Sequence, residues 1–385
     1  MWYTPRKRLL SAYACATLLA LGGLDDSGLS GVYGQEWQVA AEADVAASAT
    51  APSEAAAAHG PHRGVVPFTP TATESTVATR FRLEPHTFPV AQQQPKIVGG
   101  RFAISRLTFP SPVKTPHEAN NTVHCEYYCP VTPAQPPVPG VVVLHILGGD
   151  FALSRLVCTS LAAKGVAALF VKMPYYGPRR QAGVDVRMVS ANPQQTVAGM
   201  TQAVVDIRRA VAWLLAQKEI DPKRIGICGI SLGGITASLA ATAEPRITHV
   251  CPVLAGGDVG KLVWESPEVR HVRDRWVRDG GTRESLVELL RDVDPVTHAR
   301  GMHGRDILMI NATHDELVPR ACTESLWEAF GRPRIVWLDG GHYTVAWHIL
   351  KALRLVVDFF QGADDGRSHV ERLADPSRPV TGESE

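Results

Sequence analysis

The 385-residue sequence has almost no net charge, because 39 lysines and arginines stand against 38 aspartates and glutamates. Nucleic-acid-binding and membrane-surface proteins usually carry a basic excess or patch, so the overall balance favours neither partner. The sequence also lacks any group of cysteines and histidines with the spacing of a zinc site. We therefore expect no metal ion, no cofactor and no nucleic-acid partner.

The N-terminal apolar run, Leu9–Leu24, has sixteen residues, fewer than the roughly 20 that a membrane-spanning helix needs. Arg6, Lys7 and Arg8 precede it, and two aspartates follow it. A basic start and a short apolar run are typical of a removed export signal. We assign residues 1–34 to this signal, although no single cleavage site stands out. We expect a secreted or periplasmic protein without a stable membrane anchor.

Cysteine is sparse, with seven residues, and no disulfide pairing follows from the sequence. Cys125 and Cys129 lie in a run with the pattern of a strand, which separates their Cα atoms by roughly 13 Å. A disulfide between them requires the chain to turn there. Cys228 and Cys251 lie in apolar strand-like runs and are expected to be buried, small hydrophobic side chains.

The composition divides the chain into segments. Residues 35–77 are rich in Ala, Ser, Thr and Pro without a sustained hydrophobic period, which indicates a disordered linker. Residues 363–385 are polar and are predicted to form a frayed tail. Residues 78–362 have the size of one α/β domain. Within them, residues 256–295 contain two tryptophans and many arginines, and they are either a lid or a solvated helical surface.

Apolar runs and helical patterns alternate through this domain. The runs that predict buried strands are Val141–Leu144, Val166–Val171, Ile225–Cys228, His249–Leu254, Ile307–Ile310 and Ile335–Leu338. Between them, a stripe from Val197 to Leu214 predicts a helix, with Asn192 as its cap, Pro193 in its first turn and Gln195 placed to reach back. The predicted fold class is α/β, with a mostly parallel central sheet and helices on both faces.

The pentapeptide Gly229-Ile230-Ser231-Leu232-Gly233 stands between a predicted strand and a predicted helix. A serine at the apex of such a turn adopts strained backbone angles, and small neighbours are needed to allow them. Its hydroxyl is then exposed at a helix N-terminus, where negative charge is stabilised. The pattern can occur by chance, but its position between strand and helix favours Ser231 as a nucleophile.

A serine nucleophile needs a base and an acid that orients the base. Asp315 follows the predicted strand Ile307–Ile310, and His342 follows the next, Ile335–Leu338. Both therefore fall at the carboxyl edge of the sheet, where open α/β folds bind ligands. We predict Asp315 as the acid and His342 as the base.

Other residues compete for these two roles. Asp294 and Asp339 are alternative acids, although Asp294 can simply cap the chain before Pro295, and Asp339 is close to His342 along the backbone. His314 precedes the acid and His348 falls within a predicted helix, so each suits the base role less well than His342.

Backbone amides are expected to bind the developing oxyanion. Leu232 follows the nucleophile, and Leu147 lies in the turn after the first long strand, with Gly148 as its alternative. Tyr176, in the loop after the second strand, is a candidate hydrogen-bond donor to substrate or oxyanion. Its aromatic ring can equally serve to pack the loop.

With these motifs, residues 139–361 resemble the α/β-hydrolase superfamily, in the neighbourhood of dienelactone-hydrolase-like proteins and serine esterases. The resemblance implies the roles given above for Ser231, Asp315 and His342, and it matches the segment from His145 to an oxyanion loop. Ile146 stands where glycine is usual in that loop, which leaves its donor open. Dienelactone hydrolases use cysteine as nucleophile, so their specific activity is not implied.

These features predict a serine hydrolase that cleaves a carboxylic ester through an acyl-enzyme, acting on a small or carbohydrate-linked ester. A peptidase of the prolyl-oligopeptidase type is an alternative, but too few folded residues precede the first core strand for a propeller. An acyltransferase with the same three residues is chemically open. A non-catalytic binding protein on the same scaffold is the alternative of a different class.

Overall fold

The computed structural model describes residues 62–131, 137–149 and 151–362. The predicted export signal, the first part of the predicted linker and the predicted C-terminal tail lie outside these ranges. The six cysteines within them are free, and Cys228 and Cys251 are both buried, as predicted.

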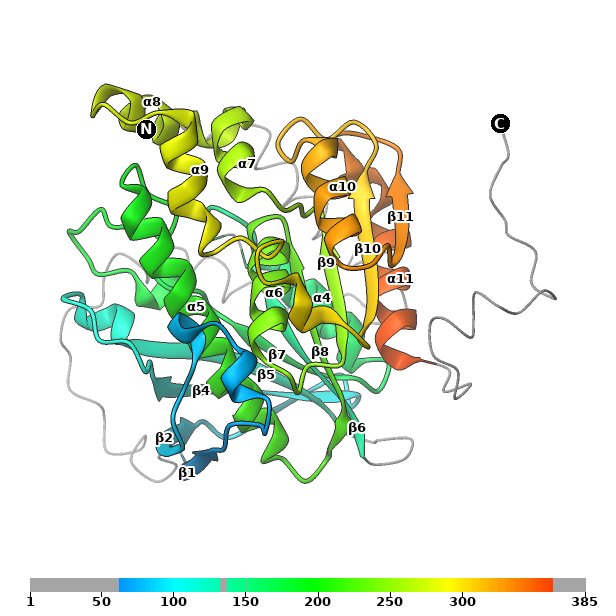
Figure 1. The fold of residues 1–385 in the computed structure, drawn as a ribbon. Helices are drawn as coiled ribbons and strands as arrows, with labels where there is room; N and C mark the ends of the chain where they lie inside the picture. The colour runs from blue at the N-terminus through cyan, green and yellow to red at the C-terminus, as the bar shows by residue number, and fades with distance from the viewer. Residues whose placement is uncertain (1–61, 132–136, 150, 363–385) are drawn as a thin grey trace.

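A single sheet of eleven strands organises the described residues (Figure 1). Its order is β1-β2-β4-β5-β7-β6-β8-β9-β10-β11, with β3 paired to β4. The strands are β1 (His62–Phe68), β2 (His86–Gln92), β3 (Lys96–Val98), β4 (Phe102–Pro110), β5 (Thr122–Pro130), β6 (Val138–Leu144), β7 (Ala167–Val171), β8 (Ile220–Ile230), β9 (His249–Val253), β10 (Asp306–Ala312) and β11 (Arg334–Leu338).

The half of the sheet from β7 to β11 is parallel, whereas β1 to β5 pair antiparallel with their neighbours. Every residue of β6 and β7 is buried, because helices cover a parallel sheet on both faces. This arrangement confirms the predicted α/β class and the mostly parallel sheet.

The helices are α4 (Ala152–Ala162), α5 (Pro193–Leu215), α6 (Leu232–Ala243), α7 (Val259–Glu265), α8 (Arg270–Arg278), α9 (Arg283–Arg291), α10 (Arg320–Ala329) and α11 (Ile349–Gln361). Alternate residues of β6 divide between two hydrophobic clusters. Val142 and Leu144 pack with α5 and α6, and Val141 and Val143 pack with α4 and α11. Because strand side chains alternate between faces, these helix pairs lie on opposite faces of the sheet.

The predicted start of α5 is confirmed in part. Asn192 caps the helix by accepting a hydrogen bond from the backbone N–H of Gln194, and Pro193 is the first helical residue. The predicted return contact of Gln195 does not form, and its buried amide nitrogen has no hydrogen-bond partner in the described structure.

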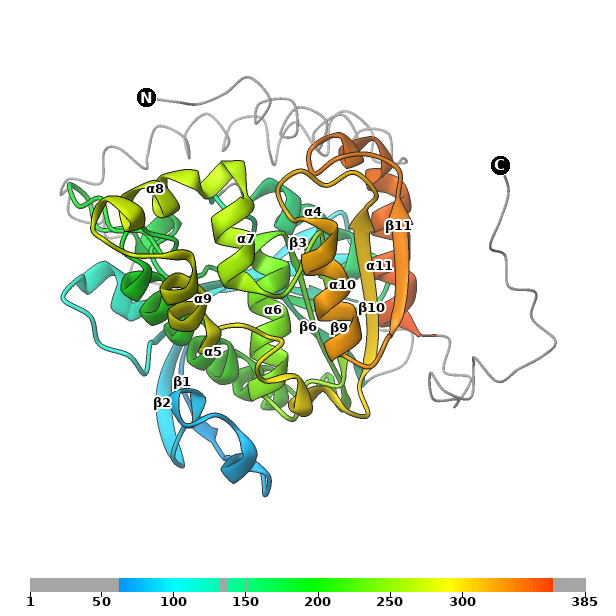
Figure 2. The ribbon, with the colours of Figure 1, turned by 45° about the horizontal axis from the view of Figure 1, so that its top comes forward.

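The predicted linker boundary at residue 77 is wrong for residues 62–77, because β1 pairs along its length with β2 (Figure 2). Phe68 anchors this segment: it is 1% exposed, and the guanidinium groups of Arg208 and Arg246 lie 5.2 and 5.0 Å from its ring centroid. The prediction failed because the buried side chains of this segment, among them Val66 and Val77, are few and are separated by polar residues, so they give no sustained hydrophobic pattern.

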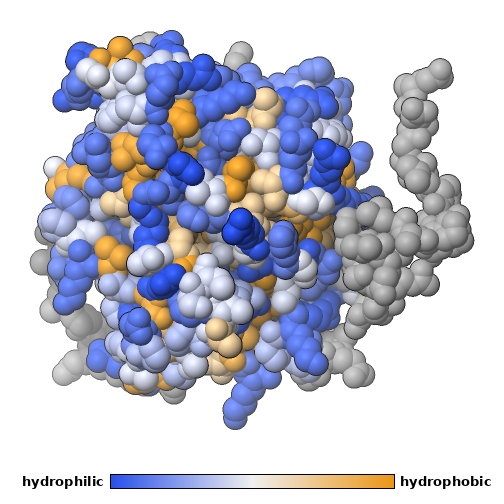
Figure 3. All heavy atoms as spheres, in the orientation of Figure 1, coloured by the Kyte–Doolittle hydropathy of each residue, from blue (hydrophilic) through white to orange (hydrophobic). Residues whose placement is uncertain are grey.

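Residues 256–295 connect β9 to β10 and contain α7, α8 and α9, which lie together at the end toward which the parallel strands point (Figures 1 and 2). Val277 and Val287 of this segment are exposed apolar side chains. Figure 3 shows apolar and polar residues interspersed over one face of the molecule. No helix in the described ranges is long and apolar enough to cross a membrane.

Candidate functional site

Ser231 occupies the turn between β8 and α6 with φ 55° and ψ −117°. Its backbone N–H donates to the carbonyl of Val253 at the end of β9, 2.8 Å away. A residue other than glycine is strained at positive φ, and such strain persists only where the surrounding structure fixes the backbone. The predicted sharp strand-to-helix turn is therefore present at Ser231.

The two glycines of the pentapeptide are required by close backbone contacts. A Cβ on Gly229 would lie 2.2 Å from the carbonyl oxygen of Gly233. A Cβ on Gly233 would lie 2.6 Å from the carbonyl oxygen of His145, just after β6. Glycine at these positions thus lets the first turn of α6 pack against the loop that follows β6.

His342 and Asp315 meet Ser231 at this edge of the sheet. His342 Nε2 lies 3.0 Å from Ser231 Oγ, and His342 Nδ1 lies 2.8 Å from Asp315 Oδ2. The imidazole is 8% exposed. The three side chains predicted from separate strand ends therefore form one continuous hydrogen-bonded chain.

The loops that carry the acid and the base are tied to each other. Asp315 Oδ1 accepts hydrogen bonds from the backbone N–H groups of Leu317 and Val318, at 2.9 and 2.8 Å. The backbone N–H of His342 donates to Glu316 Oε2 at 3.0 Å. Sequence reasoning missed this contribution of Glu316; the one available signal was its place beside the predicted acid.

The alternative acids and bases have other contacts. Asp294 accepts hydrogen bonds from the backbone N–H of Val259, at the start of α7, and from that of Val296. Burial raises the pKa of Asp294. The Asp339 side chain is 86% exposed and lies 3.7 Å from His314. Neither acid has a hydrogen bond to His342 in the described structure.

His145 begins the loop after β6 and is fully buried. Its Nδ1 lies 2.9 Å from the carbonyl oxygen of Ile146, and its Nε2 accepts the backbone N–H of Met173 at 3.1 Å. Both contacts are satisfied by the neutral ring with its proton on Nδ1. His145 therefore links the loop after β6 to the loop after β7.

The backbone N–H groups of Leu147 and Leu232, the two predicted oxyanion donors, have no acceptor within the described ranges. Gly148, the alternative donor, lies near Tyr176, and its backbone N–H lowers the pKa of that phenol against the larger effect of burial. An unpaired N–H at a helix N-terminus is a good anion-binding group. In the described structure the amides of Leu147 and Leu232 are therefore free to bind an oxyanion.

Tyr176 lies beside this loop. Its ring meets the His145 ring edge-on, with centroids 4.6 Å apart, and a Cβ on Gly149 would lie 3.0 Å from it. Burial raises the pKa of Tyr176, so the hydroxyl is protonated at neutral pH. A protonated phenol can donate a hydrogen bond to a substrate oxygen.

Acid is expected to destabilise the protein through His145. Burial, with a smaller effect from the positive charges of Lys172 and Arg179, lowers the pKa of His145 from 6.5 to about 4. Between these pH values the unfolded chain binds a proton that the folded chain does not. Unfolding free energy therefore falls by about 3 kcal/mol as pH drops from 6.5 to 4. Urea titrations across this range measure the loss.

The matched variant is His145→Gln, which lacks the titrating ring. Its unfolding free energy should be lower than that of the wild type at pH 8 and should change less with pH. His124, whose pKa burial also lowers to about 4, accounts for part of the remaining slope. An unchanged slope in His145→Gln would contradict the assignment.

The segment 256–295 reaches the loop of the predicted base. The hydroxyl of Tyr343, the residue after His342, donates to Glu268 Oε2 at 3.1 Å.

No cluster of three or more His, Cys, Asp or Glu side chains in the described ranges is arranged to hold a metal ion.

Comparison with protein families gives two matches. The model described as alpha/beta hydrolase domain containing 18 matches residues 90–259, and that of the prolyl oligopeptidase family matches residues 200–336. Uncharacterized proteins of Mycobacterium tuberculosis strains CDC 1551 / Oshkosh and H37Rv are 34% identical over 183 residues, or 46% of this chain. The matched region spans only 42% of the length of these relatives.

Two solved structures share the fold. Acetyl xylan esterase from Paenibacillus sp. R4 is 21% identical, with a TM-score of 0.54 over 69% of this chain and 88% of its own. Acetyl xylan esterase 1 from Thermoanaerobacterium sp. JW/SL YS485 is 16% identical, with a TM-score of 0.53 over 73% and 91%. Together with the two partial family matches, the sheet and its strand-to-helix turn, these likenesses show that the chain has the α/β-hydrolase fold.

Proposed function

We propose that the protein is a serine hydrolase that cleaves a carboxylic ester through an acyl-enzyme on Ser231. The observation that carries the proposal is the chain of hydrogen bonds from Asp315 through His342 to Ser231, with distances of 2.8 and 3.0 Å. A serine hydroxyl becomes a competent nucleophile when a positioned imidazole accepts its proton. The acid holds that imidazole in the tautomer that leaves Nε2 free to act.

In the proposed reaction, Ser231 Oγ attacks the ester carbonyl carbon while His342 Nε2 takes the hydroxyl proton. The tetrahedral intermediate then expels the alcohol, which receives this proton from His342. Water attacks the acyl-enzyme in the same way, and the acid product leaves. The amides of Leu147 and Leu232 are proposed to bind the oxyanion in both steps, and the phenol proton of Tyr176 is proposed to add a third hydrogen bond.

The proposed substrate class is an ester of a small acyl group with a small alcohol or a carbohydrate. Two proteins of the same fold are acetyl xylan esterases, so acetylated sugars are the first compounds to test. The basic and apolar start of the sequence, outside the described residues, supports a secreted or periplasmic location as part of the proposal.

A peptidase of the prolyl-oligopeptidase type is the second candidate, because that family model matches residues 200–336. The described residues before β6 form β1 to β5, which extend the same sheet, and they form no propeller. This arrangement favours the esterase over the peptidase.

The test compares 4-nitrophenyl acetate, butyrate and octanoate with a proline-containing peptide. We expect hydrolysis of the short-chain esters to exceed that of the peptide by at least an order of magnitude in kcat/KM. Preferential cleavage after proline would favour the peptidase. Absence of labelling by a fluorophosphonate, together with no hydrolysis, would favour a binding protein on this scaffold.

A further inference from the structure

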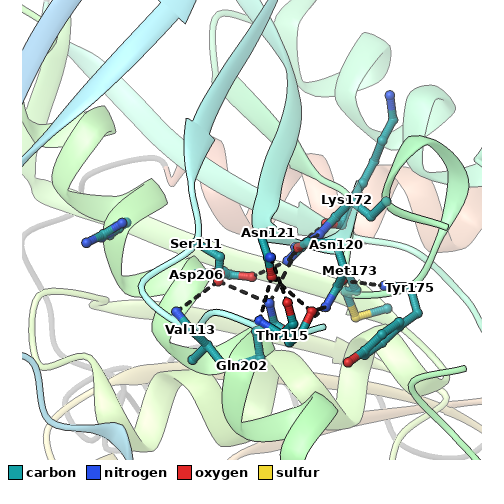
Figure 4. Close-up of polar contacts among 12 residues, drawn as sticks. Ser111, Val113, Thr115, Asn120, Asn121, Lys172, Met173, Tyr175, Gln202 and Asp206 are labelled. Atoms are coloured by element: carbon teal, nitrogen blue, oxygen red, sulfur yellow. Dashed lines mark hydrogen bonds and ion pairs between the residues drawn. The ribbon is translucent and has the colours of Figure 1, made fainter. Parts of the chain in front are cut away.

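A buried polar network lies beneath the loop that carries Tyr176. Ser111, Asn120, Gln202 and Asp206 point toward one another from the end of β4, from the 3-10 helix Glu118–Asn121 and from α5 (Figure 4). None is more than 7% exposed. Asp206 accepts the Ser111 hydroxyl at 2.6 Å, and Gln202 accepts the Asn120 amide at 2.8 Å.

Arg179 joins this network to the loop after β7. Its side chain is fully buried and forms an ion pair with Asp206 at 2.8 Å. It also donates to the carbonyl of Lys172, where the loop begins, at 3.1 Å, and to that of Asn120 at 2.8 Å. Its own backbone N–H donates to the carbonyl of Tyr176 at 3.0 Å. One guanidinium group thus fixes the loop at both ends.

Asn120 holds the middle of the same loop. Its Oδ1 accepts the backbone N–H of Tyr175 at 2.9 Å. Tyr175 has φ 65°, a strained conformation for a residue other than glycine, which persists only where contacts impose it. The next residue is Tyr176, so the Asn120 contact also fixes the backbone position from which the Tyr176 side chain extends.

A stabilising role alone does not explain why this network is polar. Buried ion pairs lose much of their attraction to desolvation, and apolar side chains of similar size often serve a core as well. The polar groups instead fix the position of the loop, because one side-chain hydrogen bond of Asn120 and one of Arg179 end on backbone atoms between Lys172 and Arg179. The same loop donates the Met173 N–H to His145, beside the proposed oxyanion donors.

We propose that Asn120 and Arg179 are positioning residues, which hold the strained Tyr175 so that the Tyr176 hydroxyl faces the oxyanion. This inference rests on the proposed ester hydrolysis and adds a specific means of preorganising it. Neither residue touches Ser231, His342 or Asp315 in the described structure. Their effect on the reaction therefore passes through Tyr176.

A double-mutant cycle tests the coupling. Tyr176→Phe and Asn120→Ala are each expected to lower kcat about 100- to 1,000-fold on 4-nitrophenyl acetate, in line with the loss of one oxyanion donor, and to change KM little. If Asn120 acts through Tyr176, the double variant loses no more than the worse single variant. A merely structural defect would instead multiply the two losses.

Arg179→Lys provides a second route if Asn120→Ala fails to fold. Its matched control is Arg208→Lys, because Arg208 is also fully buried and paired with Glu244 but has no contact with the loop. Both lysine variants should lower Tm. Only Arg179→Lys should lower kcat, again without a further loss in the Tyr176→Phe background.

Fluorophosphonate labelling of the wild type is measured first, so that the two proposals fail separately. No labelling refutes the proposed function. Labelling with multiplicative losses, full activity in Tyr176→Phe, or an equal loss of kcat in Arg208→Lys refutes the positioning role alone.

Discussion

Ser231→Ala is expected to abolish fluorophosphonate labelling and to lower kcat about 10⁶-fold, the size of loss seen when a hydrolase serine is removed. The acyl-enzyme needs an oxygen at this position, and alanine offers none. Residual activity should come from the proposed oxyanion donors and from substrate binding. Intact-mass spectrometry after probe treatment measures the adduct, and ester hydrolysis measures the rate.

Ser238 supplies the control for this experiment. It lies in the same helix, α6, is fully buried, and its hydroxyl has no hydrogen-bond partner in the described structure. Ser238→Ala should keep labelling and kcat at the wild-type level, because removing an unpaired buried hydroxyl costs little. Labelling that persists in Ser231→Ala and disappears in Ser238→Ala would overturn the assignment of the nucleophile.

Asp315→Asn is expected to lower kcat about 10⁴-fold. The carboxylate accepts the His342 Nδ1 proton at 2.8 Å, which keeps Nε2 free to take the serine proton. An asparagine amide facing Nδ1 donates instead and favours the tautomer protonated on Nε2. The loss should appear in kcat with little change in KM, and Tm should change little because the Asn oxygen can still accept the Leu317 N–H.

The two rival acids make this prediction specific. Asp294→Asn should lower Tm, because Asp294 holds the backbone N–H groups at the start of α7 and at Val296, while kcat stays near wild type. Asp339→Asn should leave both unchanged, since that side chain is 86% exposed. A 10⁴-fold loss in Asp294→Asn, with Asp315→Asn active, would transfer the acid role to Asp294.

Some features of the fold could be predicted because they depend on local sequence. The central parallel strands are covered on both faces, so each is encoded as a short continuous apolar run, as in Val141–Leu144 and Ile307–Ile310. The turn at Ser231 could be predicted because a Cβ at Gly229 or Gly233 would overlap backbone atoms. Strand β1 could not, since its few buried residues lie within a polar segment.

The roles of Asn120, Arg179 and Glu316 could not be predicted either. A buried Asn or Arg looks the same in sequence as an exposed one, and its meaning depends on partners far along the chain. Arg179 meets Asp206, 27 positions away, and Asn120 meets Tyr175, 55 positions away. No hydrophobic period in the sequence indicates such pairs.

By itself, the sequence determined which segments became buried strands and which strand ends carry a serine, an aspartate and a histidine, because hydrophobic patterning and steric demands act over a few residues. The tertiary structure alone decided the distances among these side chains and the orientation of the Tyr176 loop. Those depend on how the strand ends align at the sheet edge and on buried hydrogen bonds between distant segments, which no local pattern specifies.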